Sequence, residues 1–244
     1  KTIWTFHNII RTIARIKIFA KYTTRNMLYI VSTPIGNMKD ITYRAVEILG
    51  EVDFVLAEDS RRTGILLKHY GVSNKLIIYN DTNKERKTSG IIRDLLNDKN
   101  IALVTDSGTP GISDPGFYLV RECVKNNTKV LPIPGANAVI SALVCSGLPT
   151  DRFTFYGFLP KKPGKFKELI DEANSRTETA IFYESPHRII KTLKRLNDQI
   201  PDKQIVIGRE LTKKFEEFIR GKVSDMYTQL KDKKLKGEIV VLLN

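Results

Sequence analysis

The sequence predicts a two-domain α/β protein, and three observations support that prediction. From Met27 onward, short apolar runs alternate with amphipathic stretches, the pattern of parallel βαβ units with right-handed crossovers. A turn-rich segment, residues 146–151, ends this series, so we expect one domain over residues 27–147 and a second over residues 148–244. Loops rich in glycine, proline or charge follow several predicted strands, at the sheet edge where α/β proteins bind ligands.

Composition favours a globular protein of a reducing compartment with a polyanionic partner. Of the 244 residues 41% are hydrophobic, and the net charge of +13 with a pI of about 9.6 favours RNA; a lysine-rich composition without such a partner is the alternative. Two cysteines, Cys123 and Cys145, exclude a disulfide framework, and the three histidines show no spacing for a metal site. No apolar run approaches the roughly 18 residues of a membrane span, and we expect a cytoplasmic protein.

Residues 1–26 differ from the rest of the chain. They contain six basic residues and no acidic one, and their apolar residues recur at helical spacing. Three interpretations are open: an organelle-targeting leader, a helix that contacts a membrane surface or RNA, or upstream sequence before a true start at Met27. We favour the third because a predicted strand begins directly after Met27. Without this segment 34 basic residues face 27 acidic ones, so the remainder carries +7.

In the first half, strands and helices alternate in an order typical of a parallel sheet. Asp40 is a plausible N-cap for the first helix, and Gly50 follows its predicted end. Strands are expected at residues 28–32, 53–57, 75–79, 101–104 and 129–133. Helices are expected at residues 42–49, 88–96, 117–124 and 136–145, with a further helix that ends at Gly71.

The second half contains neighbouring strands with no helix between them, so we expect a mixed sheet and an α+β domain. Ser185 is a suitable N-cap for a helix, and Pro186 a suitable first helical residue. Strands are expected at residues 153–157, 179–183, 204–208, 216–220 and 237–243. Helices are expected from the end of a basic loop, residues 159–167, to about residue 173, and at residues 186–196 and 224–230.

The stretch of residues 101–116, I-A-L-V-T-D-S-G-T-P-G-I-S-D-P-G, is the central candidate for a ligand loop. A buried strand leads into three glycines, which permit close backbone approach, and two prolines, which restrict the turns. An ordinary connection between a strand and a helix is the alternative. Four further stretches also lie at strand ends, and charge at strand ends in both halves indicates a shared cleft. They are residues 32–37, 58–62, 182–188 and 209–213.

Taken together, these motifs resemble the tetrapyrrole methylase superfamily of S-adenosylmethionine-dependent methyltransferases, and more closely its RNA-directed branch. The resemblance covers residues 28–244 and rests on motifs in one order along the chain. In the first half these are S-T-P-I-G-N at 32–37, A-E-D-S-R at 57–61, T-D-S-G-T-P-G-I-S-D-P-G at 105–116 and P-I-P-G-A at 132–136. They continue with S-G-L-P-T-D-R-F at 146–153, G-F-L-P-K-K at 157–162, F-Y-E-S-P-H-R at 182–188 and R-E-L-T-K at 209–213.

The resemblance implies a fold of two halves, each a βαβ sheet with helices, with S-adenosylmethionine bound in the cleft between them. It implies a homodimer whose substrate is 16S ribosomal RNA or the small ribosomal subunit, methylated on the ribose 2′-hydroxyl of a cytidine in the decoding region. Asn137 and Ser107 depart from the family's usual residues. The cofactor-binding positions that carry over by motif are Ile35, Gly36, Ser107, Gly108, Thr109, Pro110, Ile112, Asn137, Ala138, Glu184 and Leu211.

A ribose hydroxyl is a poor nucleophile until a general base takes its proton, which can contribute a factor of about 10²–10⁴. The candidates are Asp59, Asp106, Glu184 and Glu210, or Lys213 if its pKa is lowered. Our hypothesis assigns catalysis to Asp106, Glu210 and Lys213, with the two carboxylates most important.

Basic loops near the cleft are candidates for RNA contact, and Phe158 and Phe166 beside them offer rings that can stack on bases. A solvated lysine-rich face is the alternative. The basic candidates are Arg61, Arg62, Lys161, Lys162, Lys165, Lys167, Arg188, Lys213 and Lys214.

Other functions compete with this interpretation. One is a methyltransferase for a tetrapyrrole or its precursors, and the basic F-L-P-K-K loop argues against it. Another is an RNA-binding assembly factor that keeps the fold without catalysis. A nicotinamide-binding protein is disfavoured because no G-x-G-x-x-G follows a predicted strand, and we expect no metal.

Overall fold

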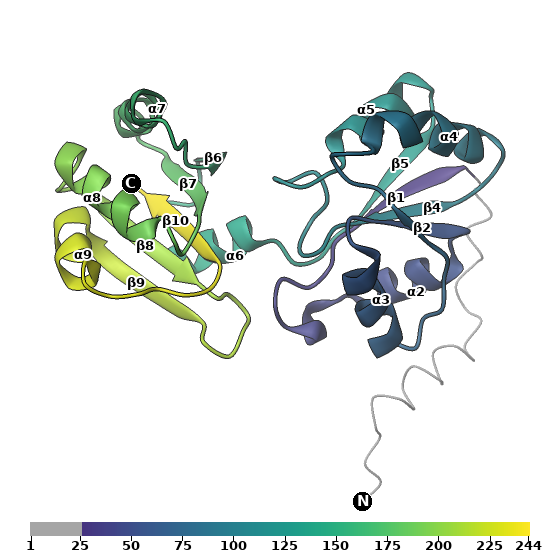
Figure 1. Ribbon diagram of the computed structural model, residues 1–244, viewed down its shortest axis with the longest axis horizontal. Coiled ribbons are helices and arrows are strands. Elements are labelled where there is room, and N and C mark those ends of the chain that lie inside the picture. Colours follow the sequence, from purple (N-terminus) through teal and green to yellow (C-terminus); the bar gives the residue numbers. More distant parts are fainter. Residues whose placement is uncertain (1–25) are drawn as a thin grey trace, which may run out of the picture.

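The computed structural model describes residues 26–244, which contain two five-stranded sheets, one in each half of the chain (Figure 1). The three interpretations of the basic leader concern residues that, except for Asn26, lie outside the described part. No helix within residues 26–244 combines the length and the apolar character that crossing a membrane requires.

The first sheet is parallel throughout, as the alternation of strands and helices predicts. Its strand order is β3-β2-β4-β1-β5, and every pairing is parallel. The strands are β1 (Met27–Val31), β2 (Phe54–Ala57), β3 (Leu76–Ile78), β4 (Ile101–Val104) and β5 (Lys129–Ile133). Strands β2 and β4 are buried along their whole length because helices cover both faces of the sheet.

Those helices divide evenly between the two faces (Figure 1). Helices α2 (Tyr43–Glu51) and α3 (Ser60–His69) pack against alternate residues of β1, among them Tyr29 and Val31. Helices α4 (Lys84–Leu96) and α5 (Phe117–Lys125) pack on the opposite face, against Leu28. The loops at the carboxyl ends of β1, β4 and β5 therefore emerge together at one edge of the sheet.

The second sheet is mixed, as expected, with the order β6-β7-β10-β8-β9. Within it β6 and β7 run parallel, and the other pairs are antiparallel. The strands are β6 (Phe153–Phe158), β7 (Thr179–Glu184), β8 (Gln204–Arg209), β9 (Glu217–Lys222) and β10 (Ile239–Leu243). One face is covered by α7 (Pro163–Ser175), α8 (Ile189–Gln199) and α9 (Val223–Leu230), which enclose Phe182 and Val241.

Helix α6 (Ala138–Ser146) follows the last strand of the first sheet but packs on the free face of the second. Its buried residues Val139, Ala142 and Leu143 contact Val206 and Val240. By these contacts the helix belongs with the second half, whereas the sequence places the division after it, between residues 147 and 148. We propose that the division lies ahead of α6, near residues 134–137.

Several helix starts differ from the sequence prediction because other side chains cap them. Thr42, rather than Asp40, accepts a hydrogen bond from the Ala45 amide (3.1 Å) and starts α2, while Asp40 ends a short 3-10 turn, Met38–Asp40. Gly50 lies inside α2 rather than after it.

Other helices begin at different residues from those predicted. Helix α4 starts at Lys84 rather than at residue 88. Helix α8 starts at Ile189, because Ser185 closes a separate turn in which its hydroxyl accepts from the His187 amide (3.3 Å). Helix α7 starts at Pro163, so part of the predicted basic loop is helical.

Phe182→Ala should lower the free energy of unfolding by about 3–5 kcal/mol, because the ring lies fully buried in the core under α7, α8 and α9. Urea denaturation followed by circular dichroism measures the loss. Phe215→Ala is the matched control, since that ring is 64% exposed and its removal should cost less than about 0.5 kcal/mol. Equal losses in the two variants would contradict the assignment of this core.

Candidate functional site

The loops that follow β1 and β4 are joined by a short backbone bridge. The Thr33 amide donates to the Gly108 carbonyl (2.9 Å), and the Gly108 amide donates back to the Thr33 carbonyl (3.0 Å). Gly108 has a φ of 79°, which residues with a side chain rarely adopt. A Cβ there would make only an ordinary contact, 3.4 Å from Ile35 Cγ2, so the preference for glycine comes from the backbone conformation of this loop.

The loop that follows β5 is held to the same two loops by hydroxyl groups. Ser32 Oγ and Thr109 Oγ1 share a hydrogen bond of 3.0 Å, and Thr109 Oγ1 also donates to the Ala136 carbonyl (3.2 Å). Gly135 permits this contact because a Cβ there would come within 2.8 Å of Ser32 Cβ. The three loops thus form one rigid edge of the first sheet.

The first half meets the second where Gly36 lies against the loop that follows β8. A Cβ at Gly36 would overlap Lys213 Cγ, and the Asn37 amide donates to Thr212 Oγ1 (3.1 Å). Glu210 and Thr212 both have positive φ, 50° and 65°. Strain of this kind persists only where the surroundings impose it, and it concentrates at functional sites.

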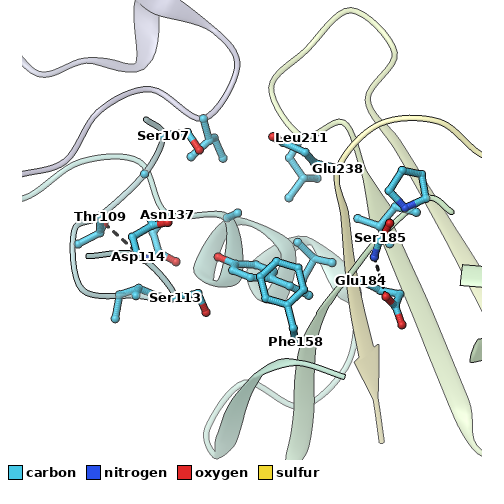
Figure 2. Close-up of a pocket in the computed structure, with 18 residues that line it drawn as sticks. Ser107, Thr109, Ser113, Asp114, Asn137, Phe158, Glu184, Ser185, Leu211 and Glu238 are labelled. Atoms are coloured by element: carbon cyan, nitrogen blue, oxygen red, sulfur yellow. Dashed lines mark hydrogen bonds between the residues drawn. The ribbon is translucent and has the colours of Figure 1, made fainter. Parts of the chain in front are cut away.

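Between these edges lies a cavity of about 330 Å³ (Figure 2). Side chains of the first-half loops, such as Thr109, face those of the second half, such as Leu211, across it. The cofactor positions predicted by motif all line it except Gly36, which packs at its edge, and Pro110, which is buried beside it. The prediction did not include Ser113, Asp114, Phe158, Tyr183, Ser185, Pro186, Glu238, Ile239 and Val240, which also line it.

Charge in the cavity has one sign. Among its lining residues the charged side chains are Asp114, Glu184 and Glu238, and none carries a positive group. Phe158 and Tyr183 add aromatic rings in edge contact, with centroids 5.5 Å apart. Carboxylates and aromatic faces both attract cations, so the lining favours a positively charged ligand.

Glu184 is buried, and its carboxylate is already engaged by three neighbours. It accepts from the Thr192 hydroxyl (2.6 Å) and the Ser185 amide (2.7 Å), and the Arg188 guanidinium lies 3.4 Å away. Arg188 also donates to the Leu159 carbonyl (2.7 Å). These contacts argue against Glu184 as a general base. They also direct the Arg188 side chain, which was predicted to contact RNA, toward the interior.

Lys213 joins two carboxylates, one of which lines the cavity. Its amine lies 2.9 Å from Glu210 Oε1 and 2.9 Å from Glu238 Oε2. Burial lowers the pKa of Lys213, but these carboxylates outweigh burial and raise it overall, while Lys213 lowers the pKa of Glu210. The hypothesis that Lys213 acts as a base through a lowered pKa is therefore wrong, because the amine stays protonated.

Asp106 is placed outside the cavity. Its carboxylate lies 3.3 Å from the Arg62 guanidinium, and its amide donates to Glu58 Oε2 (3.3 Å). Asp59 forms an ion pair with Arg61 (2.7 Å) and caps α3. The predicted catalytic Asp106 and Glu210 therefore do not line the cavity, whereas Asp114 and Glu238 do.

The predicted RNA-contacting residues divide into exposed and enclosed groups. Lys161, Lys162 and Lys165 are exposed, as are Arg61 and Arg62 with side chains 87% and 68% accessible. The prediction that Phe166 stacks on bases is wrong, because it is buried beneath α8 with the Arg195 guanidinium 3.6 Å from its ring centre. Phe158 is 59% exposed at the cavity mouth.

No group of three or more metal-ligating side chains occurs in the described part of the chain. The two cysteines lie apart: Cys123 is buried in the first half and Cys145 is exposed on α6.

Comparisons with known proteins place the chain in a class of methyltransferases. The family model for tetrapyrrole (corrin/porphyrin) methylases matches residues 27–227, so the chain belongs to that family. It is 43% identical over 219 residues to ribosomal RNA small subunit methyltransferase I of Halalkalibacterium halodurans, covering 90% of this chain and 76% of the relative. A relative of the same name from Vibrio cholerae is 45% identical over 221 residues, covering 89% and 77%.

Solved structures share the fold at much lower identity. Diphthine synthase aligns with a TM-score of 0.67 at 16% identity, over 89% of each chain. Uroporphyrin-III-C-methyltransferase from Thermus thermophilus aligns with a TM-score of 0.61 at 17% identity, over 89% of this chain and 94% of that one. The family and the two-sheet fold predicted from the motifs are thereby confirmed.

Asp114→Asn should change how stability depends on pH. Burial, and then the Glu58 and Asp106 carboxylates, raise the pKa of Asp114 from 3.8 to about 6. An unfolded aspartate titrates at about 3.9, so the stability that its proton supplies is complete below about pH 4 and lost as pH rises through about 6.

The amide removes this loss, so the unfolding free energy of Asp114→Asn, relative to wild type, should rise between about pH 4 and pH 7. Urea denaturation across this range tests it, with the exposed Asp198→Asn as control. A difference that stays constant with pH would contradict the assignment.

Proposed function

We propose that this methyltransferase transfers the methyl group of S-adenosylmethionine to the ribose 2′-hydroxyl of a cytidine in the decoding region of 16S ribosomal RNA. The names of its relatives support the substrate class. The observation that carries the proposal is the cavity between the two halves, whose charged lining residues are all acidic. When bound, S-adenosylmethionine supplies a methyl group made electrophilic by a positive sulfonium.

The residues present fit such a donor. A volume of about 330 Å³ lies in the range of small-molecule sites, roughly 300–1,000 Å³. Gly108 lines the cavity and has no side chain, so a ligand can approach its backbone. Asp114 and Glu238 favour a cation, and Phe158 can lie against one. The rigid loops hold the donor in one orientation, and orientation can supply about 7–11 kcal/mol in favourable cases.

For proton removal, we propose that the carboxylates of Asp114 and Glu238, which line the cavity, approach the reacting hydroxyl most closely. Glu210 and Lys213 act through Glu238, which the Lys213 amine fixes at the cavity wall. Asp106 acts through Arg62 at the outer rim. These three residues are positioning residues in this proposal rather than groups that touch the substrate.

RNA contact is assigned to the exposed basic residues around the mouth, including Lys161 and Lys162, with Phe158 available for stacking. We place the protein in the cytoplasm, with 16S ribosomal RNA or the small ribosomal subunit as its partner. Homodimer formation is part of the proposal, and the exposed apolar residues Ile140 and Val144 on α6 support it, at 46% and 65% accessible.

Gly108→Val should weaken S-adenosylmethionine binding at least about 10-fold, because a branched side chain strains a backbone at φ 79° and enters the cavity wall. Isothermal titration calorimetry measures the change. Gly90→Val is the control, since a Cβ there meets nothing within 4 Å. Equal affinities for the two variants, both folded by circular dichroism, would remove the cavity as the donor site.

Incubation with methyl-labelled S-adenosylmethionine and small subunits that lack the native modification should label 16S RNA at one cytidine ribose. Mass spectrometry of nuclease fragments locates the label, and Gly108→Val provides the inactive control. Donor binding without transfer would instead support an assembly factor. Transfer to a tetrapyrrole precursor but not to RNA would support the small-molecule alternative.

A further inference from the structure

A second hollow, of about 680 Å³, opens beside the methyl-donor cavity. We call it the lysine hollow; residues 231–237, between α9 and β10, line it together with Pro186, His187 and Ile190. Pro186 lines both the hollow and the cavity, so the two are neighbours across one residue. Figure 1 shows the segment between α9 and β10 as the yellow loop that leads into β10.

Four lysines of this short segment line the hollow: Lys231, Lys233, Lys234 and Lys236. All four are exposed, and none forms an ion pair with another described residue. Asp232 adds a single exposed carboxylate among them. The carboxyl end of α9 favours a positive charge at its C-cap residue, Lys231. This effect does not reach the three lysines that follow, so the helix end does not explain why four lysines gather here.

The backbone that carries these lysines is fixed at both ends. The Lys233 amide donates to the Leu230 carbonyl (2.9 Å) at the end of α9. Leu235 packs against the core under the second sheet, and the Arg209 guanidinium donates to the Lys236 carbonyl (3.0 Å). The amines therefore extend from an ordered segment, which reduces the entropy cost when they bind an extended polyanion.

The chain runs directly from the lysines into the wall of the cavity. Gly237 has a φ of 89°, and a Cβ there would overlap the Glu210 side chain, so glycine is required at this turn. Glu238 and Ile239, the next residues, line the methyl-donor cavity. A ligand that lies in the lysine hollow is thus led toward the cavity mouth.

We propose that the lysine hollow binds the phosphodiester backbone of the single-stranded RNA whose ribose is methylated. The proposal rests on the proposed function. Positively charged grooves that follow a nucleic-acid backbone bind single strands. Here the lysines provide a site for phosphate, and the acidic cavity beside them provides a different site for a cationic donor. The hollow fixes the position of the strand, and the cavity receives the ribose.

The test compares two pairs of charge reversals with equal change in net charge. Lys233→Glu/Lys234→Glu alters the hollow, and Lys75→Glu/Lys129→Glu is the control, at exposed positions by the amino ends of β3 and β5. Fluorescence anisotropy measures binding of a fluorescein-labelled single-stranded RNA of decoding-region sequence. The titrations run between about 50 and 300 mM KCl, a range in which phosphate contacts make RNA binding strongly dependent on salt.

The hollow variant should bind RNA about 10-fold more weakly than the control, and its salt dependence should be shallower by about 0.7 in log–log slope for each phosphate that it no longer neutralises. Its affinity for S-adenosylmethionine should match that of wild type by calorimetry, which shows that the cavity is intact. Equal affinity and slope in the two pairs would overturn the proposal.

Methyl transfer by the wild-type chain tests the proposed function independently of RNA binding by the hollow. If wild type methylates small subunits while the hollow variant binds RNA like the control, the function stands and the hollow is excluded. If the hollow variant alone loses RNA binding but wild type transfers no methyl group, the hollow stands as an RNA-binding site and the proposed methylation is excluded.

Discussion

The structure depends on the pair of backbone hydrogen bonds between Thr33 and Gly108. They join the loops that follow β1 and β4, two neighbouring strands of the parallel sheet, into a single edge. Because both backbone groups of each residue are used, the loops cannot separate without exposing two donors and two acceptors. Ser32 and Thr109 extend the same edge to the loop that follows β5. One wall of the cavity is therefore set by the first half alone.

The opposite wall depends on how the second half is attached. Helix α6 begins at Ala138, directly after Asn137, whose side chain caps the helix by accepting from the Ile140 amide (3.2 Å). The buried face of the helix lies on the second sheet. Asn137 and Ala138 both line the cavity, so the covalent link between the halves is part of the site. The contact of Gly36 with the strained loop at Thr212 closes the same edge from the other side. Movement of one half against the other would change both contacts together.

Local sequence patterns predicted the strands and the parallel first sheet, because these depend on periodicity. Most cavity residues of the first half were predicted only through the motifs that resemble the methylase family. Residues 101–104 and 129–133 form β4 and β5 as predicted. The sequence did not show which of the two sheets α6 packs against, because its apolar residues could pack on either one. Glu238 was missed for a related reason: it belongs to none of the motifs, and only the packing of β10 brings it to the cavity. Asp114 lies in the motif at residues 105–116, but it was not among the cofactor positions that carried over from that motif. Phe166 was wrongly predicted to be accessible because its sequence neighbours are basic, whereas on the helix these neighbours face the solvent and the ring faces the core.

The distribution of charge explains how one small region can accept two ligands of opposite sign. Acidic side chains line the cavity, while lysines surround the hollow beside it. Lys213 lies between its two carboxylates, so the positive charge that it brings to Glu238 is neutralised locally and does not make the cavity positive. In the proposed arrangement the acidic lining of the cavity repels phosphate groups, and the lysines of the hollow attract them. A polyanion can then bind at the rim and leave the cavity open to a cationic donor.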